Sequence, residues 1–161
     1  MVNKKQGKNE RYRDGPREKE YEQKLVDLSR VTRVTKGGKQ MNFRATVVVG
    51  DRKGKVGFGM GKAGDVSVAI DKAAKAAKKF LFTVPIKGGT IPHEIYAKFG
   101  SGKVLLKPAN PGKGIKAGGA MRIVLELAGV PNVTGKILGS NNKINILYAT
   151  FKALKQLMVK K

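Results

Sequence analysis

The chain has 161 residues, with 34 Lys and Arg against 11 Asp and Glu, a formal net charge of +23 and no Cys. The absence of Cys excludes disulfides, thiol catalysis and cysteine-ligated zinc. A charge surplus of this size exceeds what solubility requires, and it is typical of a protein that binds a polyanion, above all a nucleic acid.

Residues 1–23 are polar and highly charged, with almost no aliphatic side chains, and we expect a flexible tail there. Six of the eleven acidic residues lie in 1–27, so the rest of the chain combines 26 basic residues with five acidic ones. No stretch has the apolar segment of a secretory signal or approaches the ~20 apolar residues that span a bilayer. The basic residues are spread over several predicted elements rather than along one amphipathic helix, so we expect a cytosolic protein without a membrane partner.

An antiparallel meander of three strands is predicted after the tail. The first strand covers residues 24–35, which are rich in β-branched side chains, and Gly37-Gly38 supplies a two-residue hairpin turn. Residues 40–50 alternate apolar side chains onto one face, and residues 55–60 form a third strand after the turn "DRKG". Because both connections are short, neighbouring strands run in opposite directions.

A helix is predicted from Asp65, a good N-cap, to about Phe82. Its apolar residues recur at helical spacing and form one buried stripe, whereas Lys72, Lys75 and Lys79 lie on a different face. Two prolines and two glycines follow in "VPIKGGTIP", and we place a domain boundary there.

The second half again begins with strands and ends with a helix. The pattern predicts, in order, strand 93–99, strand 103–108, a loop rich in Gly and Pro, helix 120–128, strand 133–138 and a final helix beginning near Ser140 or Asn142. Gly129 is the expected C-terminal cap of the first of these helices. The expected organisation is a tail over 1–23, a first domain over 24–86 and a second domain over 90–161.

The motif "GMGKAG" at residues 59–64 matches G-x-G-x-x-G, which opens dinucleotide-binding folds. Such a site also needs a parallel βαβ unit and an acidic residue about 20 positions further on. The predicted strands are antiparallel, and no acid occurs at that distance, the next one being Glu94. The Walker motif fails too, because Lys62 is followed by Ala63, and the similar "FGSGKV" at 99–104 precedes a strand instead of a helix. A dinucleotide oxidoreductase is the alternative from the enzyme class, and this context argues against it.

Two interpretations of these glycines are open. In the first, a twisted or bulged strand end leads tightly into the helix, or the positions require positive φ. In the second, the missing Cβ atoms of Gly59 and Gly61 let a phosphodiester backbone come close, next to a helix amino terminus that favours anions. Four basic residues surround the motif, namely Arg52, Lys53, Lys55 and Lys62. We favour the second interpretation.

Other catalytic constellations are missing from the sequence. His93 is the only His, so a His-rich metal site is impossible, and a catalytic triad would depend on this one residue. A packing or hydrogen-bonding role is the simpler interpretation. Glu126 stands alone on an apolar helix, four residues after Arg122, which predicts a local ion pair. We therefore expect no enzymatic activity, no cofactor, no metal and no small-molecule substrate.

The three strands and the lysine-bearing helix resemble a double-stranded-RNA-binding domain without its first helix. A closer resemblance covers about residues 24–157. Four stretches resemble, in order, the signature sequences of bacterial small-subunit ribosomal protein five, of the universal small-subunit protein five family: "VVVGDRKGKVGFGMGKAGDV", "GGTIPHEI", "KPANPGKGIKAGGAMRIVLELAGV" and "LGSNNKINILYAT". One departure adds charge, because Lys113 and Lys116 occur where the family pattern has "PGTG" followed by an aliphatic pair.

The resemblance implies an α+β fold. A double-stranded-RNA-binding-like domain, with a three-stranded antiparallel sheet plus helix, precedes a small α/β sandwich domain with a left-handed βαβ crossover. The resemblance also implies a structural constituent of the small ribosomal subunit that binds small-subunit ribosomal RNA and contacts the neighbouring ribosomal proteins four and eight. Such a protein lies near the messenger entrance and the head–body junction and affects assembly and accuracy. A free-standing binder of double-stranded RNA is the alternative among binding proteins.

The predicted RNA-binding surface combines the hairpin tip, the glycine-rich region, the lysines of the first helix and the loop of the second domain. The tip, Thr35 to Gln40, corresponds to the family's extended loop towards the head–body hinge RNA, and its lysines make it a slim cationic finger. Contacts to phosphate carry no base information. The residues are Lys36, Gly37, Gly38, Lys39, Arg44, Arg52, Lys53, Lys55, Phe58, Gly59, Gly61, Lys62, Lys72, Lys75, Lys79, Lys113 and Lys116.

Overall fold

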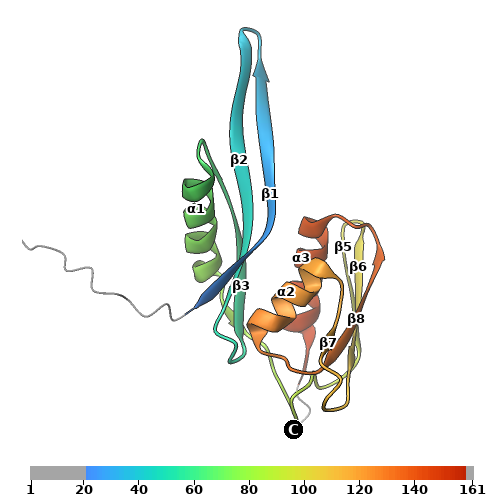
Figure 1. Ribbon diagram of the computed structural model, residues 1–161. Coiled ribbons are helices and arrows are strands. Elements are labelled where there is room, and N and C mark those ends of the chain that lie inside the picture. The colour runs from blue at the N-terminus through green and yellow to red at the C-terminus, as the bar shows by residue number, and fades with distance from the viewer. Residues whose placement is uncertain (1–20, 159–161) are drawn as a thin grey trace, which may run out of the picture.

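The computed structural model describes residues 21–158, which form two four-stranded sheets and three helices (Figure 1). The predicted tail over 1–23 lies outside the described residues except for its last three positions. The first strand begins at Glu22, two residues before its predicted start.

The first sheet is antiparallel throughout and has the order β1-β2-β3-β4. Its strands are β1 (Glu22–Thr35), β2 (Gly38–Gly50), β3 (Lys55–Ala63) and β4 (Phe82–Thr83). Helix α1 (Val66–Lys79) follows β3 and packs on one face of this sheet (Figure 1). The far ends of β1 and β2 project beyond α1 as a two-stranded hairpin.

The second sheet has the order β5-β6-β8-β7, in which only β7 and β8 run parallel. Its strands are β5 (Ile95–Phe99), β6 (Gly102–Pro108), β7 (Ile115–Lys116) and β8 (Val133–Gly139). Helix α2 (Gly119–Ala128) connects the two parallel strands, and α3 (Lys143–Gln156) ends the described fold. Both helices lie between the two sheets (Figure 1).

The predicted α+β fold class is confirmed, and three local expectations were wrong. The hairpin turn is Lys36–Gly37 rather than Gly37-Gly38, because Gly38 already pairs with Thr35 in the ladder. Helix α1 ends at Lys79 rather than at about Phe82, and Phe82 and Thr83 form β4, so the first sheet has four strands where three were predicted. The loop before α2 contains the two-residue strand β7.

The helix ends in the second half follow the expected local chemistry. Gly129 has φ +76° and ends α2 in the left-handed conformation that favours glycine. Asn142 caps α3, because its side-chain oxygen accepts a hydrogen bond from the Ile144 amide at 3.1 Å. Asp65 occupies the N-cap position of α1 but makes no side-chain hydrogen bond there.

One hydrophobic core crosses the predicted domain boundary. Val48 and Val56 of the first sheet are fully buried against residues of α2 and α3. The turn between β2 and β3 also bonds to the carboxyl end of α2: the Arg52 amide donates to the Leu127 carbonyl at 3.0 Å, and the Gly54 amide donates to the Ala128 carbonyl at 2.9 Å. These bonds satisfy carbonyls that the helix end would otherwise leave free. The two halves therefore pack together through a shared core and backbone hydrogen bonds.

Candidate nucleic-acid interface

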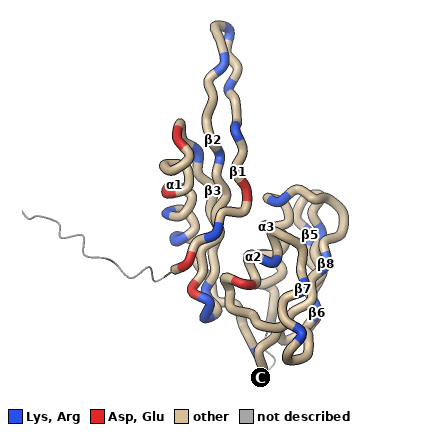
Figure 2. The backbone as a smooth tube through the Cα atoms, in the orientation of Figure 1, with Lys and Arg blue, Asp and Glu red and all other residues tan. Residues whose placement is uncertain are grey.

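The projecting hairpin is a cationic finger with no hydrophobic support of its own. Residues 32–41 are all exposed, including Val34 at 71% and Met41 at 54%. Lys36 and Lys39 lie at its tip, and the chain has no acidic residue between Asp27 and Asp51. Figure 2 shows the basic residues following one another along this hairpin. The structure thus places the predicted finger residues Lys36, Gly37, Gly38 and Lys39 together, far from the rest of the predicted surface.

Two basic residues of the finger were not among the RNA-binding residues predicted from the sequence. Arg30 and Arg33 are exposed on β1, where they lie opposite Phe43 and Gln40 of β2. They extend the cationic character of the tip towards the body of the protein. The signal that would have found them is the strand register, since both lie within a few pairs of the predicted turn.

The structure contradicts the favoured interpretation of the glycine motif. Gly59 and Gly61 are buried, and the space that their missing Cβ atoms leave is filled by the backbone of α1. A Cβ on Gly59 would overlap the Ala73 carbonyl oxygen and the Ala77 amide nitrogen. A backbone does approach these glycines closely, as expected, but it belongs to the protein's own helix and leaves no room for a phosphate on that side.

The same packing extends along the whole helix. A Cβ on Gly57 would lie 2.6 Å from the Ala77 carbonyl oxygen, and one on Gly61 would overlap the Ala69 carbonyl oxygen. Small residues on α1 meet glycines on β3, so the helix lies directly on the strand. Since β3 pairs antiparallel with both of its neighbours, the parallel unit of a dinucleotide site is also missing here.

Phe58 was predicted to contact RNA, but its ring packs inside an aromatic cluster. It meets Tyr148 edge-on, with ring centroids 4.8 Å apart, and Phe151 at 4.6 Å. Tyr148 in turn stacks on Phe99 at 4.5 Å. The cluster joins β3 to α3, so Phe58 holds the two halves together, and the half-buried ring also lines an open hollow of about 440 Å³ with Lys152 and Lys155.

The lysines of α1 form a second basic surface. Lys72, Lys75 and Lys79 are all exposed, as predicted, and Lys78 beside them is exposed as well. Lys78 and Lys79 occupy the last turn, where positive charge also compensates the helix dipole. This surface lies on the opposite side of the first sheet from α2 and α3 (Figure 1).

Three of the predicted basic residues lie in the β2–β3 turn or at the first position of β3, and one of them already has a partner. The Arg52 guanidinium makes a bidentate pair with Glu22, with Nε 2.6 Å and Nη2 3.0 Å from the two carboxylate oxygens, which raises the pKa of Arg52. Asp51 shapes the turn by accepting hydrogen bonds from the Lys53 and Lys55 amides. The side chains of Lys53 and Lys55 are exposed. Arg52 therefore fastens the turn to β1, whereas the two lysines face solvent.

Arg44 and Lys62 lie opposite each other on β2 and β3. They line a shallow hollow of about 490 Å³ together with Ile144 at the start of α3. The Arg44 Nε atom is buried without a hydrogen-bond partner in the described structure. Lys113 and Lys116 lie elsewhere, on the loop before β7 and on β7 itself, and both are exposed. The predicted residues therefore form several separate surfaces rather than one patch.

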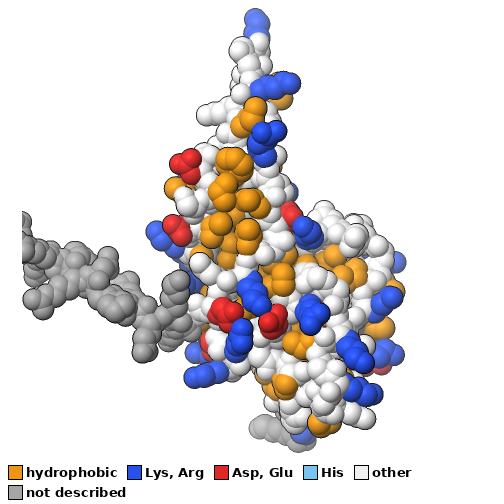
Figure 3. All heavy atoms as spheres, in the orientation of Figure 1, with side chains coloured by type: hydrophobic (Ala, Val, Ile, Leu, Met, Phe, Trp, Pro, Cys, Tyr) orange, Lys and Arg blue, Asp and Glu red, His pale blue; other side chains and the backbone are white. Residues whose placement is uncertain are grey.

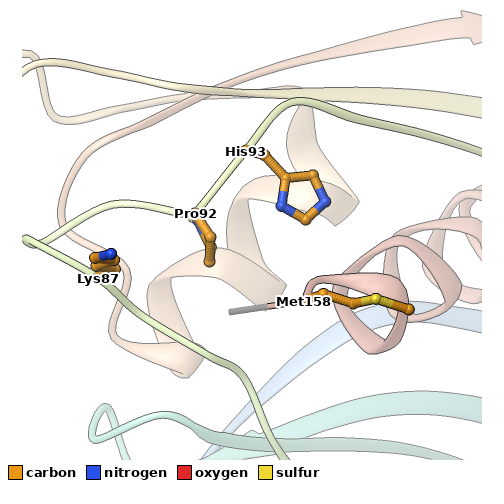
Figure 4. Close-up of a pocket in the computed structure, with 4 residues that line it drawn as sticks. All are labelled: Lys87, Pro92, His93 and Met158. Atoms are coloured by element: carbon orange, nitrogen blue, oxygen red, sulfur yellow. The ribbon is translucent and has the colours of Figure 1, made fainter. Parts of the chain in front are cut away.

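The described residues offer no catalytic arrangement around the single His. His93 is exposed and lines an open hollow of about 430 Å³ with Lys87, Pro92 and Met158 (Figure 4). No group of three potential metal ligands occurs within residues 21–158. Nor does any helix in that range have the length and apolarity to cross a membrane.

The predicted ion pair between Glu126 and Arg122 was wrong. The Glu126 carboxylate lies 2.8 Å from the ammonium of Lys24, and the hydrogen bond between them lowers the pKa of Glu126. Lys24 lies on β1, so this pair links the first sheet to α2. A second pair, Lys143 with Asp27 at 2.9 Å, links β1 to α3.

Two family models match the chain. Residues 21–85 match the N-terminal domain of ribosomal protein S5, and residues 97–160 match its C-terminal domain. Together they cover most of the sequence, including all three helices and both sheets apart from the first two residues of β5. The chain therefore belongs to the ribosomal protein S5 family, whose members are non-enzymatic structural proteins of the small ribosomal subunit.

Proposed function

We propose that this protein binds small-subunit ribosomal RNA, chiefly through phosphate contacts, and thereby supports subunit assembly, the messenger entrance and translational accuracy. Family membership supports the place in the small subunit. The distribution of basic side chains supports phosphates as the groups that they contact. The observation that carries the proposal is the projecting hairpin.

A bare two-stranded hairpin is only marginally stable in water, so the finger contributes little to the stability of the fold. The last half-buried pair of the hairpin is Val31 and Asn42, and four more residue pairs follow up to Thr35 and Gly38. At about 3.3 Å per residue, these four pairs extend the finger by roughly 13 Å. Its tip and shaft carry Arg30, Arg33, Lys36 and Lys39 without an acidic neighbour in the sequence. A narrow cationic ribbon of this kind fits between RNA segments and neutralises phosphates on both sides.

The exposed lysines of α1 provide a second contact. Lys72, Lys75 and Lys79 repeat along one helix face, and such a row follows a phosphate backbone. Lys53, Lys55, Lys113 and Lys116 add exposed charge at the β2–β3 turn and near β7. Gly59, Gly61 and Phe58 are not part of the proposed contact, since the helix and the aromatic cluster occupy them.

The family resemblance also supports finer proposals. Ribosomal proteins four and eight are the proposed protein neighbours, and the cytoplasmic ribosome is the proposed location. The finger is the part proposed to reach the hinge RNA between head and body. No small molecule, cofactor or membrane enters the proposed function.

The experiment is a salt titration of the purified protein with small-subunit ribosomal RNA. The two finger lysines and the three α1 lysines alone predict a slope of log K against log salt of about −4 to −5, and contacts from the other basic residues named above make it steeper. A slope near zero would show that the charge surplus does not serve RNA binding. A slope of this size with a random RNA, and equal affinity for it, would support phosphate contact but reject selectivity for ribosomal RNA.

A further inference from the structure

The second sheet has a face that α2 and α3 do not cover. Ala97, Val104 and Leu106 are buried on the helix side, so their neighbours along β5 and β6 point the other way. This outward face, which we call the lysine face, consists of Tyr96, Lys98, Lys103, Leu105, Lys107, Thr134, Lys136 and Leu138. Figure 2 and Figure 3 show Lys and Arg gathered along this side of the molecule, at the right of the view.

The register places like charges next to each other. Lys98 lies directly opposite Lys103, and Lys136 lies one row away, beside Leu105. Like charges directly opposite across a ladder destabilise the sheet. Glu94 pairs with Lys107 at 3.2 Å, whereas Lys98, Lys103 and Lys136 have no acidic partner among the described residues. Three ammonium groups without an acidic partner on one small face are therefore available to bind an anion from outside the chain.

An aromatic ring stands within this charged face. Tyr96 is 51% exposed, and it lies opposite Leu105, which in turn lies opposite Lys136. A sheet face with an exposed aromatic ring and basic residues around it suits single-stranded RNA, whose bases stack on the ring while lysines hold the phosphates. An A-form duplex keeps its bases stacked inside and would leave the ring unused.

The composition of the face argues against a protein partner. Lysine is depleted in protein–protein interfaces relative to the rest of the surface, because burying its ammonium group is costly. Four lysines occur here with a single acidic neighbour. None of the eight residues of the lysine face belongs to the RNA-binding set predicted from the sequence, and the face lies on the opposite side of α2 and α3 from the first sheet.

We propose that the lysine face is a separate binding surface for single-stranded RNA, on which a base stacks against Tyr96 and the phosphates contact Lys98, Lys103 and Lys136. The inference rests on the proposed function, because it takes RNA as the polyanion. It adds a second mode of binding, which recognises an unpaired segment rather than duplex phosphates.

The test compares two variants of the full chain on two probes. The sheet variant is K98Q/K103Q/K136Q, and the control variant, K87Q/R122Q/K155Q, removes three exposed charges outside both the lysine face and the RNA-binding surfaces proposed above. The probes are a fluorescein-labelled single-stranded RNA of 12 nucleotides and a 12-base-pair RNA duplex, both followed by fluorescence anisotropy. We expect the sheet variant to lower the slope of log K against log salt for the single strand by about two units. A difference of two units means that the affinity lost by the variant is about 100-fold greater at 0.1 M salt than at 1 M salt.

Two further readouts separate recognition from loss of fold. Tyr96→Ala weakens single-strand binding roughly fivefold or more, whereas Tyr96→Phe keeps it, because stacking needs the ring and not the hydroxyl. The sheet variant removes the repulsion between the opposed Lys98 and Lys103, so we expect its Tm at low salt to rise by about 1–3 °C. Weaker RNA binding by a variant that is at least as stable as the wild type cannot be caused by unfolding.

The outcomes distinguish this inference from the proposed function. Wild-type protein that binds neither probe nor ribosomal RNA overturns both. Wild-type binding together with equal slopes for sheet and control variants overturns the inference alone. Unchanged RNA binding with lost incorporation into reconstituted subunits also overturns it, and assigns the face to a protein partner.

Discussion

Substituting Gly59 tests why the glycine motif exists. A Cβ at this position would overlap backbone atoms of Ala73 and Ala77 and lie 2.9 Å from the Cβ of Ala76. Non-bonded atoms need about 3.5 Å, so α1 must move roughly 1 Å away from β3. A gap of that size removes about a quarter to a half of the dispersion attraction across the contact.

We expect Gly59→Ala to lower the free energy of unfolding by about 2–4 kcal/mol, which combines this loss with the usual cost of overpacking. For a chain of this length the corresponding loss in Tm is roughly 5–15 °C, measured by circular dichroism. Gly64→Ala is the matched control, because nothing lies within 4 Å of a Cβ there. The control should melt at or slightly above the wild-type temperature, since alanine restricts the unfolded chain.

Wild-type melting of the Gly59→Ala variant would refute the packing account. If that variant also failed to bind ribosomal RNA, the motif would be a phosphate contact after all. Loss of stability with a proportionate loss of binding is the result that the packing of α1 on β3 predicts.

Three further predictions concern other parts of the molecule. Lys36→Gln with Lys39→Gln should reduce the salt slope for ribosomal RNA by about two units and leave Tm unchanged, because the finger is outside the core; an unchanged slope would remove the finger from the interface. Gly129→Ala should destabilise by about 3 kcal/mol or more, because its φ is +76° and its Cβ would overlap the Arg52 carbonyl; a loss in Tm below about 3 °C would contradict this. The hydrogen bond from Lys143, with a second from Ser29, lowers the pKa of Asp27 below 3.8, so its stabilisation is present above that pH and is lost as the pH falls through the folded-state pKa. Asp27→Asn should therefore flatten the dependence of Tm on pH below about 4.5, and an unchanged acid profile would show that this pair does not contribute.

Local patterns predicted most elements of the fold. Alternating apolar residues located β2, and the left-handed glycine at 129 marked the end of α2. Strands of two residues, such as β4 and β7, are too short to show a period, and only pairing with a neighbour defines them. Helix α1 ended early because the chain turned back at Phe82 to pair with Val56.

The candidate site was harder to predict, because its residues depend on partners far away in the sequence. A glycine motif indicates that some backbone comes close, but it does not say whether that backbone is a phosphodiester or α1. Glu126 had Arg122 four residues away, yet it pairs with Lys24 across the two halves. Likewise, Lys98 and Lys103 became neighbours only when the register of β5 and β6 was known.

The central claim is that this protein is a structural component of the small subunit held there by RNA. The most direct measurement is a sucrose-gradient profile of native lysate at moderate salt, with and without nuclease. The protein should co-sediment stoichiometrically with small subunits, and it should leave those fractions after nuclease treatment. Protein that stays at the top of the untreated gradient, or that sediments with other RNA but not with small subunits, would contradict the account.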